Sequence, residues 1–362
     1  MSDLNQARKD INEIDAQLAD LFCRRMDAVR AVAEYKKQNG IPVEDLTREE
    51  EVIKRNSALV ENEEYRSYFV NFLRFNMEQS KRFQHRLLDG MRVAYSGVEG
   101  AFANIVAERV FPDASAVPYA DFKAAYNAVV DGECDCVMLP IENSHNGDVN
   151  KVLDLAFFGS LFINGIYDAE IIQNLLCNPG ATKETIKTVI SHPQALGQCA
   201  AFIERNGYMT EEAVNTAVAA KAVAASGRTD IAAIGSAEAA EKFGLVKLEG
   251  HINESSQNTT RFAVFSRTQR VPSKKDNRFI MMFTVKNEAG SLGRAISIIG
   301  EHGFNLRALK SRPTKELMWD YYFYAESEGN IESDRGREML KSLKKVCSHL
   351  KVVGRFENEI KI

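Results

Sequence analysis

NTTRFAVFSR, residues 258–267, places four hydrogen-bonding residues directly before an alternating apolar run. Its apolar residues Phe262, Val264 and Phe265 predict a β-strand. Further β-rich runs lie between residues 91 and 270, and helical stretches such as DFKAAYNAVVDGE separate them. Strands that alternate with helices indicate an α/β domain. The sequence therefore predicts such a domain over residues 91–270, with polar side chains at the start of this strand.

The regions on either side of this domain have different patterns. Residues 1–90 are interrupted only by NGIPV, and they predict three helices that form an all-α domain. A polar linker, RTQRVPSKKDN, follows the α/β domain. Residues 278–358 then read strand, helix, strand, strand, helix, strand, and this βαββαβ order predicts a ferredoxin-like α+β module. The chain is therefore expected to be multidomain.

The composition of the 362-residue chain, with 45% apolar and 27% charged residues, is typical of soluble globular proteins. Its net charge of −4 gives no indication of binding to nucleic acid or to an anionic membrane. The N-terminus is too polar for a secretory signal, and the six cysteines show no metal-ligand spacing. We therefore expect a cytoplasmic protein that needs no metal and no cofactor.

The first predicted helix contains a cation without a partner. Its apolar stripe, at seven-residue spacing, includes Leu4, Ile11, Leu18 and Val32. Arg25 falls within this stripe, and no acidic residue lies three or four positions away from it. Because a buried unpaired cation is strongly destabilising, Arg25 needs an anion from elsewhere.

Two more unpaired cations and two polar residues extend this pattern. Lys36 lies about three turns after Arg25 and points the same way. Arg8 lies about 25 Å from Arg25 along the helix, so it reaches the same ligand only from a second subunit. In the last predicted helix, Ser80 and Gln84 interrupt an apolar stripe. These residues form either a buried interhelical hydrogen-bond network or a pocket for a small dicarboxylate inside a helical dimer.

Polar residues follow several strands of the α/β domain. VAYSGVEGAF, PIENSHNGDV and SHPQALGQC each contain them, and the last two contribute Asn143, Ser191 and Gln198. Each loop alone favours turn chemistry. Three of them at the ends of strands predict a cleft for a small polar ligand. His192 suggests a Ser-His-acid hydrolase, but the G-x-S-x-G motif is missing.

Residues 1–90 resemble the all-helical chorismate mutases, which form intertwined dimers. The matching positions, in order and near-spacing, are Arg8, Arg25, Lys36, Asp45, Arg48, Glu49, Ser80 and Gln84. The resemblance implies the rearrangement of chorismate to prephenate. It implies that Arg25 and Arg8 of the partner subunit clamp the two carboxylates, and that Lys36 and Gln84 donate to the ether oxygen. Asp45 and Glu49 would hold the ring hydroxyl, and Arg48 and Ser80 a carboxylate.

The motifs of the α/β domain, ending with N-x-T-R-F, resemble prephenate dehydratase over about 180 residues. The implied fold is two α/β subdomains around a cleft, similar to periplasmic binding proteins. The implied reaction converts prephenate to phenylpyruvate, with Thr260 as the donor to the leaving hydroxyl and Asn143, Ser191 and Gln198 positioning the substrate. Arg261 would bind a carboxylate of the ligand, or would hold an acid such as Glu142 structurally. Ala103 departs from the family, which often has a hydroxyl residue there.

EAGSL, FNL and KSRP in residues 278–358 resemble the ACT domain of phenylalanine-regulated enzymes. The resemblance implies an L-phenylalanine site made of Gly290, Leu292, Asn305, Leu306, Ser311, Arg312 and Pro313. Ser291 and Lys310 stand where alanine and glutamate are usual. The alternative is a purely structural dimerisation module.

Together the three resemblances predict a bifunctional chorismate mutase/prephenate dehydratase of phenylalanine biosynthesis, regulated by L-phenylalanine and assembled as a dimer or tetramer. Two alternatives stay open. An arogenate dehydratase would act on a substrate that carries an amino group. A non-catalytic sensor of aromatic amino acids would keep the same polar residues and turn over nothing.

Overall fold

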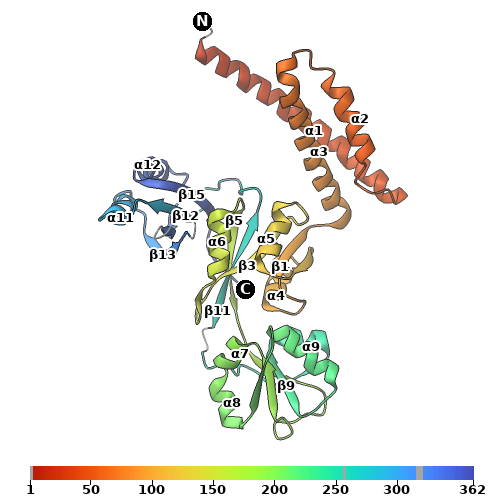
Figure 1. Cartoon of the computed structure of the whole chain (residues 1–362), viewed down its shortest axis with the longest axis vertical. Helices are drawn as coiled ribbons and strands as arrows, with labels where there is room; N and C mark the ends of the chain where they lie inside the picture. Colours follow the sequence, from red (N-terminus) through yellow and green to blue (C-terminus); the bar gives the residue numbers. More distant parts are fainter. Residues whose placement is uncertain (1–2, 256–257, 315–320) are drawn as a thin grey trace. The chain divides into compact units, whose positions relative to one another are not determined.

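The computed structural model describes residues 3–255, 258–314 and 321–362, and the chain divides into two compact units, Met1–Met91 and Arg92–Ile362 (Figure 1). The boundary falls where the sequence predicts the end of the helical domain. None of the described helices is long and apolar enough to cross a membrane.

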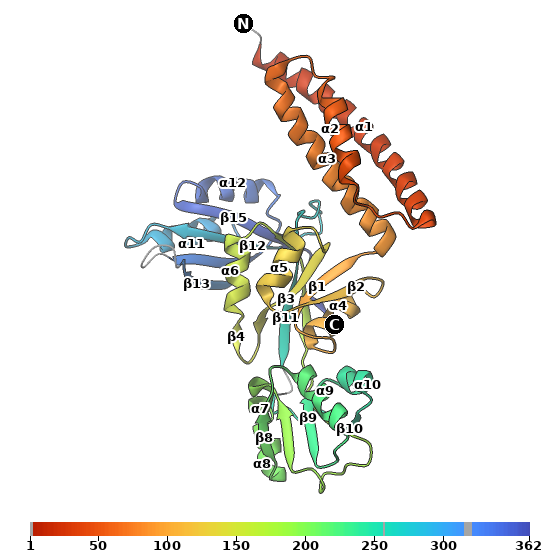
Figure 2. The same cartoon turned by 45° about the vertical axis from the view of Figure 1, so that its right-hand side comes forward.

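The first unit consists of three helices, as predicted (Figure 2). They are α1 (Leu4–Asn39), α2 (Leu46–Ser57) and α3 (Glu63–Asp89). Helix α1 ends because Gly40 adopts a left-handed conformation and its N–H bonds the Lys36 carbonyl. Helices α1 and α2 each pack against α3. This leaves much of the apolar stripe of α1 uncovered, with Leu4, Ile11 and Leu18 between 43% and 63% exposed.

The second unit begins with an α/β subdomain. Its main strands are β1 (Arg92–Ser96), β2 (Ser115–Tyr119), β3 (Cys136–Asn143), β5 (Phe162–Glu170) and β11 (Thr259–Ser266). Its helices are α4 (Phe102–Val110), α5 (Phe122–Val130) and α6 (Asn150–Phe158). Strand β1 runs parallel to β2 and β3, whereas β11 lies between β3 and β5 and is antiparallel to both. The opening decapeptide is therefore a central strand.

A second α/β subdomain is inserted between β5 and β11. Its sheet contains β6 (Asn174–Cys177), β7 (Thr188–Ser191), β8 (Met209–Glu212), β9 (Ile231–Gly235) and β10 (Val246–Glu249) in the order β10-β6-β9-β7-β8. Its helices are α7 (Pro193–Gln198), α8 (Ala200–Asn206), α9 (Thr216–Ser226) and α10 (Ala237–Phe243). The chain passes between the subdomains twice, after β5 and before β11, as a two-subdomain fold requires.

Residues 278–358 form the predicted βαββαβ module. The elements are β12 (Arg278–Val285), α11 (Ser291–Glu301), β13 (Leu306–Pro313), β14 (Tyr321–Glu328), α12 (Asp334–Leu343) and β15 (Cys347–Phe356). The strand order β13-β14-β12-β15 is that of a ferredoxin-like sheet. We call residues 278–358 the C-terminal module.

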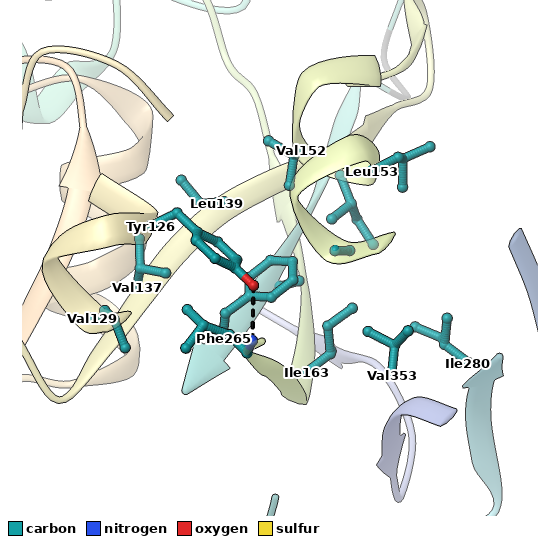
Figure 3. Close-up of a cluster of buried hydrophobic side chains, with 14 of the residues drawn as sticks. Tyr126, Val129, Val137, Leu139, Val152, Leu153, Ile163, Phe265, Ile280 and Val353 are labelled. Atoms are coloured by element: carbon teal, nitrogen blue, oxygen red, sulfur yellow. Dashed lines mark hydrogen bonds between the residues drawn. The ribbon is translucent and has the colours of Figure 1, made fainter. Parts of the chain in front are cut away.

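The C-terminal module shares its sheet and its core with the first α/β subdomain. Gly354 of β15 pairs with Ile163 of β5, and a Cβ at Gly354 would lie 2.5 Å from the Ile163 carbonyl oxygen. Val353 and Ile280 of the module belong to the same buried cluster as Phe265 (Figure 3). The sequence predicts separate domains over 91–270 and 278–358, but this common core makes residues 92–362 one compact unit.

Two short strands complete the large sheet. They are β4 (Gly147–Asp148), which pairs with β3, and β16 (Ile360–Lys361), which pairs with β5.

Candidate active sites

Arg25 of α1 extends toward α3, and no described acidic residue pairs with it. Its guanidinium donates to the Ser80 hydroxyl at 2.5 Å and to the Asn76 carbonyl oxygen at 3.3 Å. Burial lowers the pKa of Arg25, and it forms no ion pair with any of the described residues. The buried Gln84 has a side-chain oxygen without a hydrogen-bond partner in the described part of the unit. Arg25 and Gln84 can therefore bind a ligand that carries a negative charge and hydrogen-bonding groups.

The other candidate residues of this unit are engaged locally. Lys36 donates from Nζ to the Val43 carbonyl oxygen at 2.7 Å, and Glu49 pairs with Lys81 at 3.2 Å. The Asp45 carboxylate caps α2 by accepting the backbone N–H of Arg48 at 2.9 Å. The Arg48 guanidinium pairs with Glu51, and Arg8 is exposed on α1. A ligand that used Asp45 or Arg48 would have to share these contacts.

His85 ties the segment before α2 to α3. Its Nε2 lies 2.9 Å from Glu44 and its Nδ1 3.1 Å from Asp89. Burial opposes protonation, but these two carboxylates outweigh it and raise the pKa of His85. The hydrogen bond from His85 lowers the pKa of Glu44. The segment that carries Val43, the partner of Lys36, is thus held by a pH-dependent contact.

We expect His85→Gln to destabilise the helical unit only within a pH window. A raised pKa stabilises the folded state below the unfolded value of about 6.5, and this is lost as pH rises through the folded value. The lowered pKa of Glu44 means that its contribution is lost as pH falls through that value. The difference from wild type should be below about 1 kcal/mol because the pair is half-exposed. Thermal unfolding between pH 3 and pH 9, with Glu44→Gln in parallel, measures it, and a difference that persists at pH 9 would contradict the assignment.

The second unit contains a cavity of about 370 Å³ that both α/β subdomains line. Thr260, Asn143 and Gln198 line it, as do Ala103 and His192. Its remaining lining residues are Ser96, Ala101, Phe102, Phe122, Pro140, Val149, Ile171, Gln173, Gln194, Ala195, Asn215, Thr216 and Phe262. Among the described residues, none that lines it is an aspartate, glutamate, lysine or arginine. A carboxylate in this cavity would be recognised by amide, hydroxyl and backbone N–H groups.

The Thr260 hydroxyl is held so that it can donate into the cavity. Asn143 donates from Nδ2 to Thr260 Oγ1 at 2.9 Å. The orientation of the Asn143 amide is determined, because its Oδ1 accepts the backbone N–H groups of His145 and Asn146, each at 3.0 Å. No acceptor for the Thr260 hydroxyl proton exists among the described residues. The proton is therefore available to a ligand.

Asn258 connects the two halves of the cavity. It accepts from Asn143 Nδ2 at 3.0 Å and donates to Gln198 Oε1 at 3.0 Å. Asn258 is 2% exposed, so these bonds are shielded from water. No role for Asn258 was predicted from the sequence. The structure shows that it links Asn143 of the first subdomain to Gln198 of the second.

Comparisons with known proteins agree with this geometry. Residues 93–270 match the family model of prephenate dehydratase, and residues 7–85 match that of chorismate mutase type II. An arogenate dehydratase/prephenate dehydratase of Arabidopsis thaliana is 32% identical over 74% of this chain and 72% of its own. The chain belongs to the prephenate dehydratase family.

Two further relatives extend the comparison. A bifunctional chorismate mutase/prephenate dehydratase of Aquifex aeolicus is 29% identical over 98% of both chains, so it includes the helical unit. A prephenate dehydratase of Arthrobacter aurescens, solved in complex with L-Phe, is 25% identical with a TM-score of 0.69 over 74% of this chain and 90% of its own. The predicted two-subdomain fold, similar to periplasmic binding proteins, is that of the prephenate dehydratase family.

Within the dehydratase domain, Ser191 does not line the cavity. Its side chain is fully buried, and its hydroxyl donates to the Ile234 carbonyl oxygen at 2.7 Å. This placement corrects the expectation that Ser191 contacts the ligand, because its hydroxyl points into the sheet. His192, the next residue, does line the cavity, and its Nδ1 accepts the backbone N–H of Gln194.

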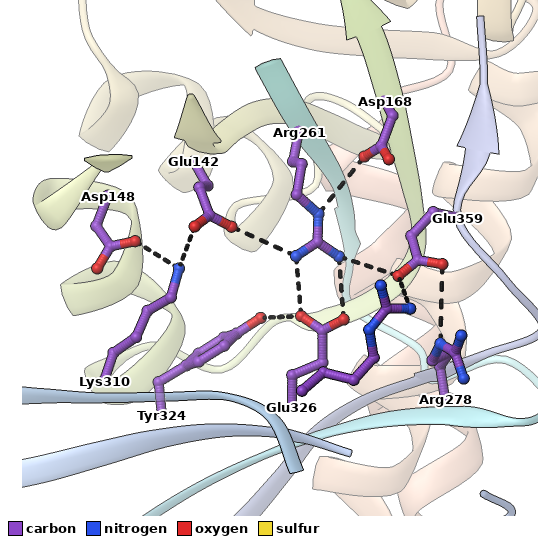
Figure 4. Close-up of polar contacts among 10 residues, drawn as sticks. Glu142, Asp148, Asp168, Arg261, Arg278, Lys310, Tyr324, Glu326 and Glu359 are labelled. Carbon is purple, nitrogen blue, oxygen red and sulfur yellow. Dashed lines mark hydrogen bonds and ion pairs between the residues drawn. The ribbon is translucent and has the colours of Figure 1, made fainter. Parts of the chain in front are cut away.

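Arg261 lies outside the lining of the dehydratase cavity, and carboxylates surround its guanidinium (Figure 4). Its guanidinium meets both carboxylate oxygens of Glu326 at 3.0 and 3.1 Å and lies 3.4 Å from Glu142. Asp168 and Glu359, each 3.5 Å away, complete its surroundings. These carboxylates surround the guanidinium, although Glu142 and Glu359 also pair with other cations. The contact with Glu142 is that of the structural alternative which the sequence left open.

Lys310 of the C-terminal module contacts the dehydratase domain. Its Nζ lies 3.1 Å from Glu142 and pairs with Asp148 (Figure 4). A glutamate at this position would bring three carboxylates together, and they would repel one another. Lys310 therefore suits the acidic residues that it meets here.

The residues expected to bind L-phenylalanine do not share one face. Arg312 pairs with Asp154 of α6 at 2.9 and 3.1 Å, whereas Ser311 and Pro313 lie exposed on β13. Leu292 and Leu306 pack against the core of the C-terminal module. Gly290 is the N-cap residue of α11 with φ 80°, and Asn305 donates to Glu328. The placement of Arg312 thus differs from the expectation, because the dehydratase domain engages its charge.

Sequence reasoning missed Gln173 in the dehydratase cavity. It is 2% exposed, and its Oε1 has no hydrogen-bond partner among the described residues. Its Nε2 donates to Gln198 at 3.4 Å. Gln173 lies between β5 and β6, at a passage between the subdomains, and a polar residue just beyond a predicted strand is the signal that could have identified it.

Proposed function

We propose that the chain is a bifunctional enzyme that rearranges chorismate to prephenate in its helical unit and converts prephenate to phenylpyruvate in the cavity at Thr260. The observation that carries the second step is the Thr260 hydroxyl, which accepts from Asn143 and keeps its own proton for a ligand. The family membership and the full-length relative support both steps.

The dehydratase step needs a donor at the leaving group. In prephenate the bond to the ring carboxylate breaks, its electrons make the ring aromatic, and the ring hydroxyl leaves. Hydroxide is a poor leaving group, so one proton must reach this oxygen as water forms. Thr260 is the donor, the hydrogen bond from Asn143 makes its hydroxyl a better one, and a proton from solvent restores the hydroxyl. Asn143 and Gln198 orient the substrate. The products are phenylpyruvate, CO₂ and water.

The mutase step needs only orientation and charge. Chorismate carries two carboxylates, and Arg25 holds one of them near Ser80. Lys36 and Gln84 donate to the ether oxygen as it becomes negative. Arg8 of the partner subunit completes the site. The exposed apolar stripe of α1 supports a second copy as its cover, because such a stripe in water is unfavourable.

The C-terminal module is proposed to be an ACT domain through which L-phenylalanine regulates the enzyme. Its ferredoxin-like strand order and the loops at Gly290 and Asn305 support this role, as does the relative solved with L-Phe. The exposed residues Ser311 and Pro313 at the edge strand β13 are open to a second copy. The effector would shift the population of dimer arrangements toward the one that it binds better.

The proposed function is tested by feeding chorismate and following prephenate and phenylpyruvate in time, with and without L-phenylalanine. We expect prephenate to rise first, phenylpyruvate to follow, and L-phenylalanine to reduce the second rate. Supplying prephenate directly separates the two steps. A chain that consumes neither compound would be a sensor, and the proposal would fail.

Arogenate dehydratase is the second candidate, since the Arabidopsis relative carries both activities in its name. Arogenate has an ammonium group where prephenate has a keto oxygen. The absence of any acidic side chain among the described lining residues favours the keto acid. Equal concentrations of both substrates in separate assays decide the question: we expect kcat/KM to be at least about tenfold higher for prephenate.

A further inference from the structure

We propose that Arg261 is a positioning residue, which joins the strand of Thr260 to Glu326 of the C-terminal module and thereby sets the place of the reactive hydroxyl. The inference rests on the proposed dehydratase function. Arg261 lies outside the cavity, yet on this proposal it affects the rate of the chemical step. That rate then also depends on how the C-terminal module packs against the strand of Thr260.

The paired strands β11 and β3 present two faces to different surroundings. In the β11–β3 ladder Thr260 lies opposite Asn143, and Arg261 lies opposite Glu142. Successive side chains alternate between faces. The first pair therefore faces the cavity, and the second pair faces the C-terminal module. A displacement of Arg261 moves the backbone of Thr260 with it, because the two are adjacent in the chain.

Strand β3 bulges beside Arg261, at Ile141, whereas β11 pairs regularly with β5 at Thr260 and Arg261. The register between β11 and β3 shifts between Arg261 and Phe262. A bulge leaves a residue unpaired in the ladder and re-aims neighbouring side chains, often beside active sites. The bulge lies beside the pairs Thr260–Asn143 and Arg261–Glu142, so the side-chain contacts of Arg261 contribute to the geometry of Thr260.

Glu326 makes this link directional and rigid. It is 1% exposed, and its carboxylate accepts two parallel hydrogen bonds from Arg261 and one from the Tyr324 hydroxyl at 3.1 Å. Arg261 is the only cation that pairs with it among the described residues. Two-point contacts restrict orientation more than a single ion pair does. The C-terminal module thus holds the guanidinium in one pose.

The test compares variants with prephenate supplied directly. We expect Glu326→Gln and Arg261→Lys each to lower kcat about tenfold or more, with KM within about twofold of wild type, because small misplacements of reacting groups reduce the rate of chemistry. Tyr324→Phe, a milder change, should lower kcat about threefold. Circular dichroism and the thermal unfolding of each preparation show whether the unit of residues 92–362 is folded.

Lys351→Gln is the matched control. Lys351 on β15 donates to the Ala156 and Gly159 carbonyl oxygens of the dehydratase domain, so it crosses the same boundary without touching the strand of Thr260. We expect its kcat to stay within about twofold of wild type even where its Tm falls. If Lys351→Gln lowered kcat as far as Glu326→Gln does, the effect would be general loosening, and the inference would be wrong.

Other outcomes of these measurements also test the inference. The double variant Glu326→Gln/Arg261→Lys should be no slower than the slower single variant, since both break one link. Additive losses would overturn the inference, as would a kcat within twofold of wild type in all three single variants. A large rise in KM with Arg261→Lys alone would instead make Arg261 a direct substrate ligand. Failure of the wild-type chain to form phenylpyruvate is a separate result, which refutes the proposed function.

Discussion

Thr260→Val should abolish phenylpyruvate formation while the mutase step continues, so that a chain fed with chorismate accumulates prephenate. Valine keeps the shape of the side chain and removes the hydroxyl that we propose as the donor. A positioned proton donor contributes about 10²- to 10⁴-fold to a rate, so we expect kcat for prephenate to fall about 10³-fold. This corresponds to about 4 kcal/mol of lost transition-state stabilisation.

Thr259→Val is the matched control, because it makes the same change one residue earlier on the other face of the strand. Thr259 lines a different cavity, together with Arg261 and Glu142. Its kcat should stay within about threefold of wild type. If Thr260→Val formed phenylpyruvate at a comparable rate, the donor would have to be another group, and the assignment of the cavity would fail.

Arg25→Met should abolish the rearrangement of chorismate and leave the conversion of supplied prephenate unchanged. Arg25 is a half-buried cation whose contacts are neutral oxygen atoms, so its charge is available for a substrate carboxylate. Loss of one such electrostatic contact typically costs about 10²- to 10³-fold in rate. We expect a loss at the upper end of this range, because the cation also orients the flexible substrate.

The stability of the Arg25→Met variant provides a second readout. Burial lowers the pKa of Arg25, so the folded chain bears a cost for its charge. Removing a residue that serves the ligand and not the fold should leave Tm unchanged or raise it. Arg24→Gln is the control, since the neighbouring Arg24 is exposed and pairs with Asp20. A fall in Tm of several degrees with Arg25→Met would indicate a structural role instead.

Much of the cavity could be expected from polar residues just beyond predicted strands. Asn143, Gln198 and Thr260 come from three distant segments, and all three line one cavity. The same reasoning failed for Ser191, which occupies a comparable place after its strand but turns its hydroxyl toward Ile234. A loop pattern indicates that polar groups gather at the end of a sheet. It does not indicate which way each side chain points.

Helix and strand order followed from the sequence because it depends on local spacing. The three helices of the first unit and the βαββαβ module needed only periodicity, breaks and caps. The uncompensated charge of Arg25 was equally local, since it came from the absence of acids one turn away. Such features depend only on neighbouring residues, so they can be predicted without knowledge of distant contacts.

The decapeptide at 258–267 illustrates what only the tertiary structure decided. Its alternation was enough to predict a strand, in which the successive residues Thr260 and Arg261 lie on opposite faces. Whether Arg261 meets a ligand or Glu326 depends on residues 65 positions apart in the chain. The docking of the C-terminal module, through a shared core and the pairing of Gly354 with Ile163, brings that carboxylate to the strand. Long-range packing therefore determines that Arg261 pairs with Glu326. A local sequence pattern does not indicate such packing.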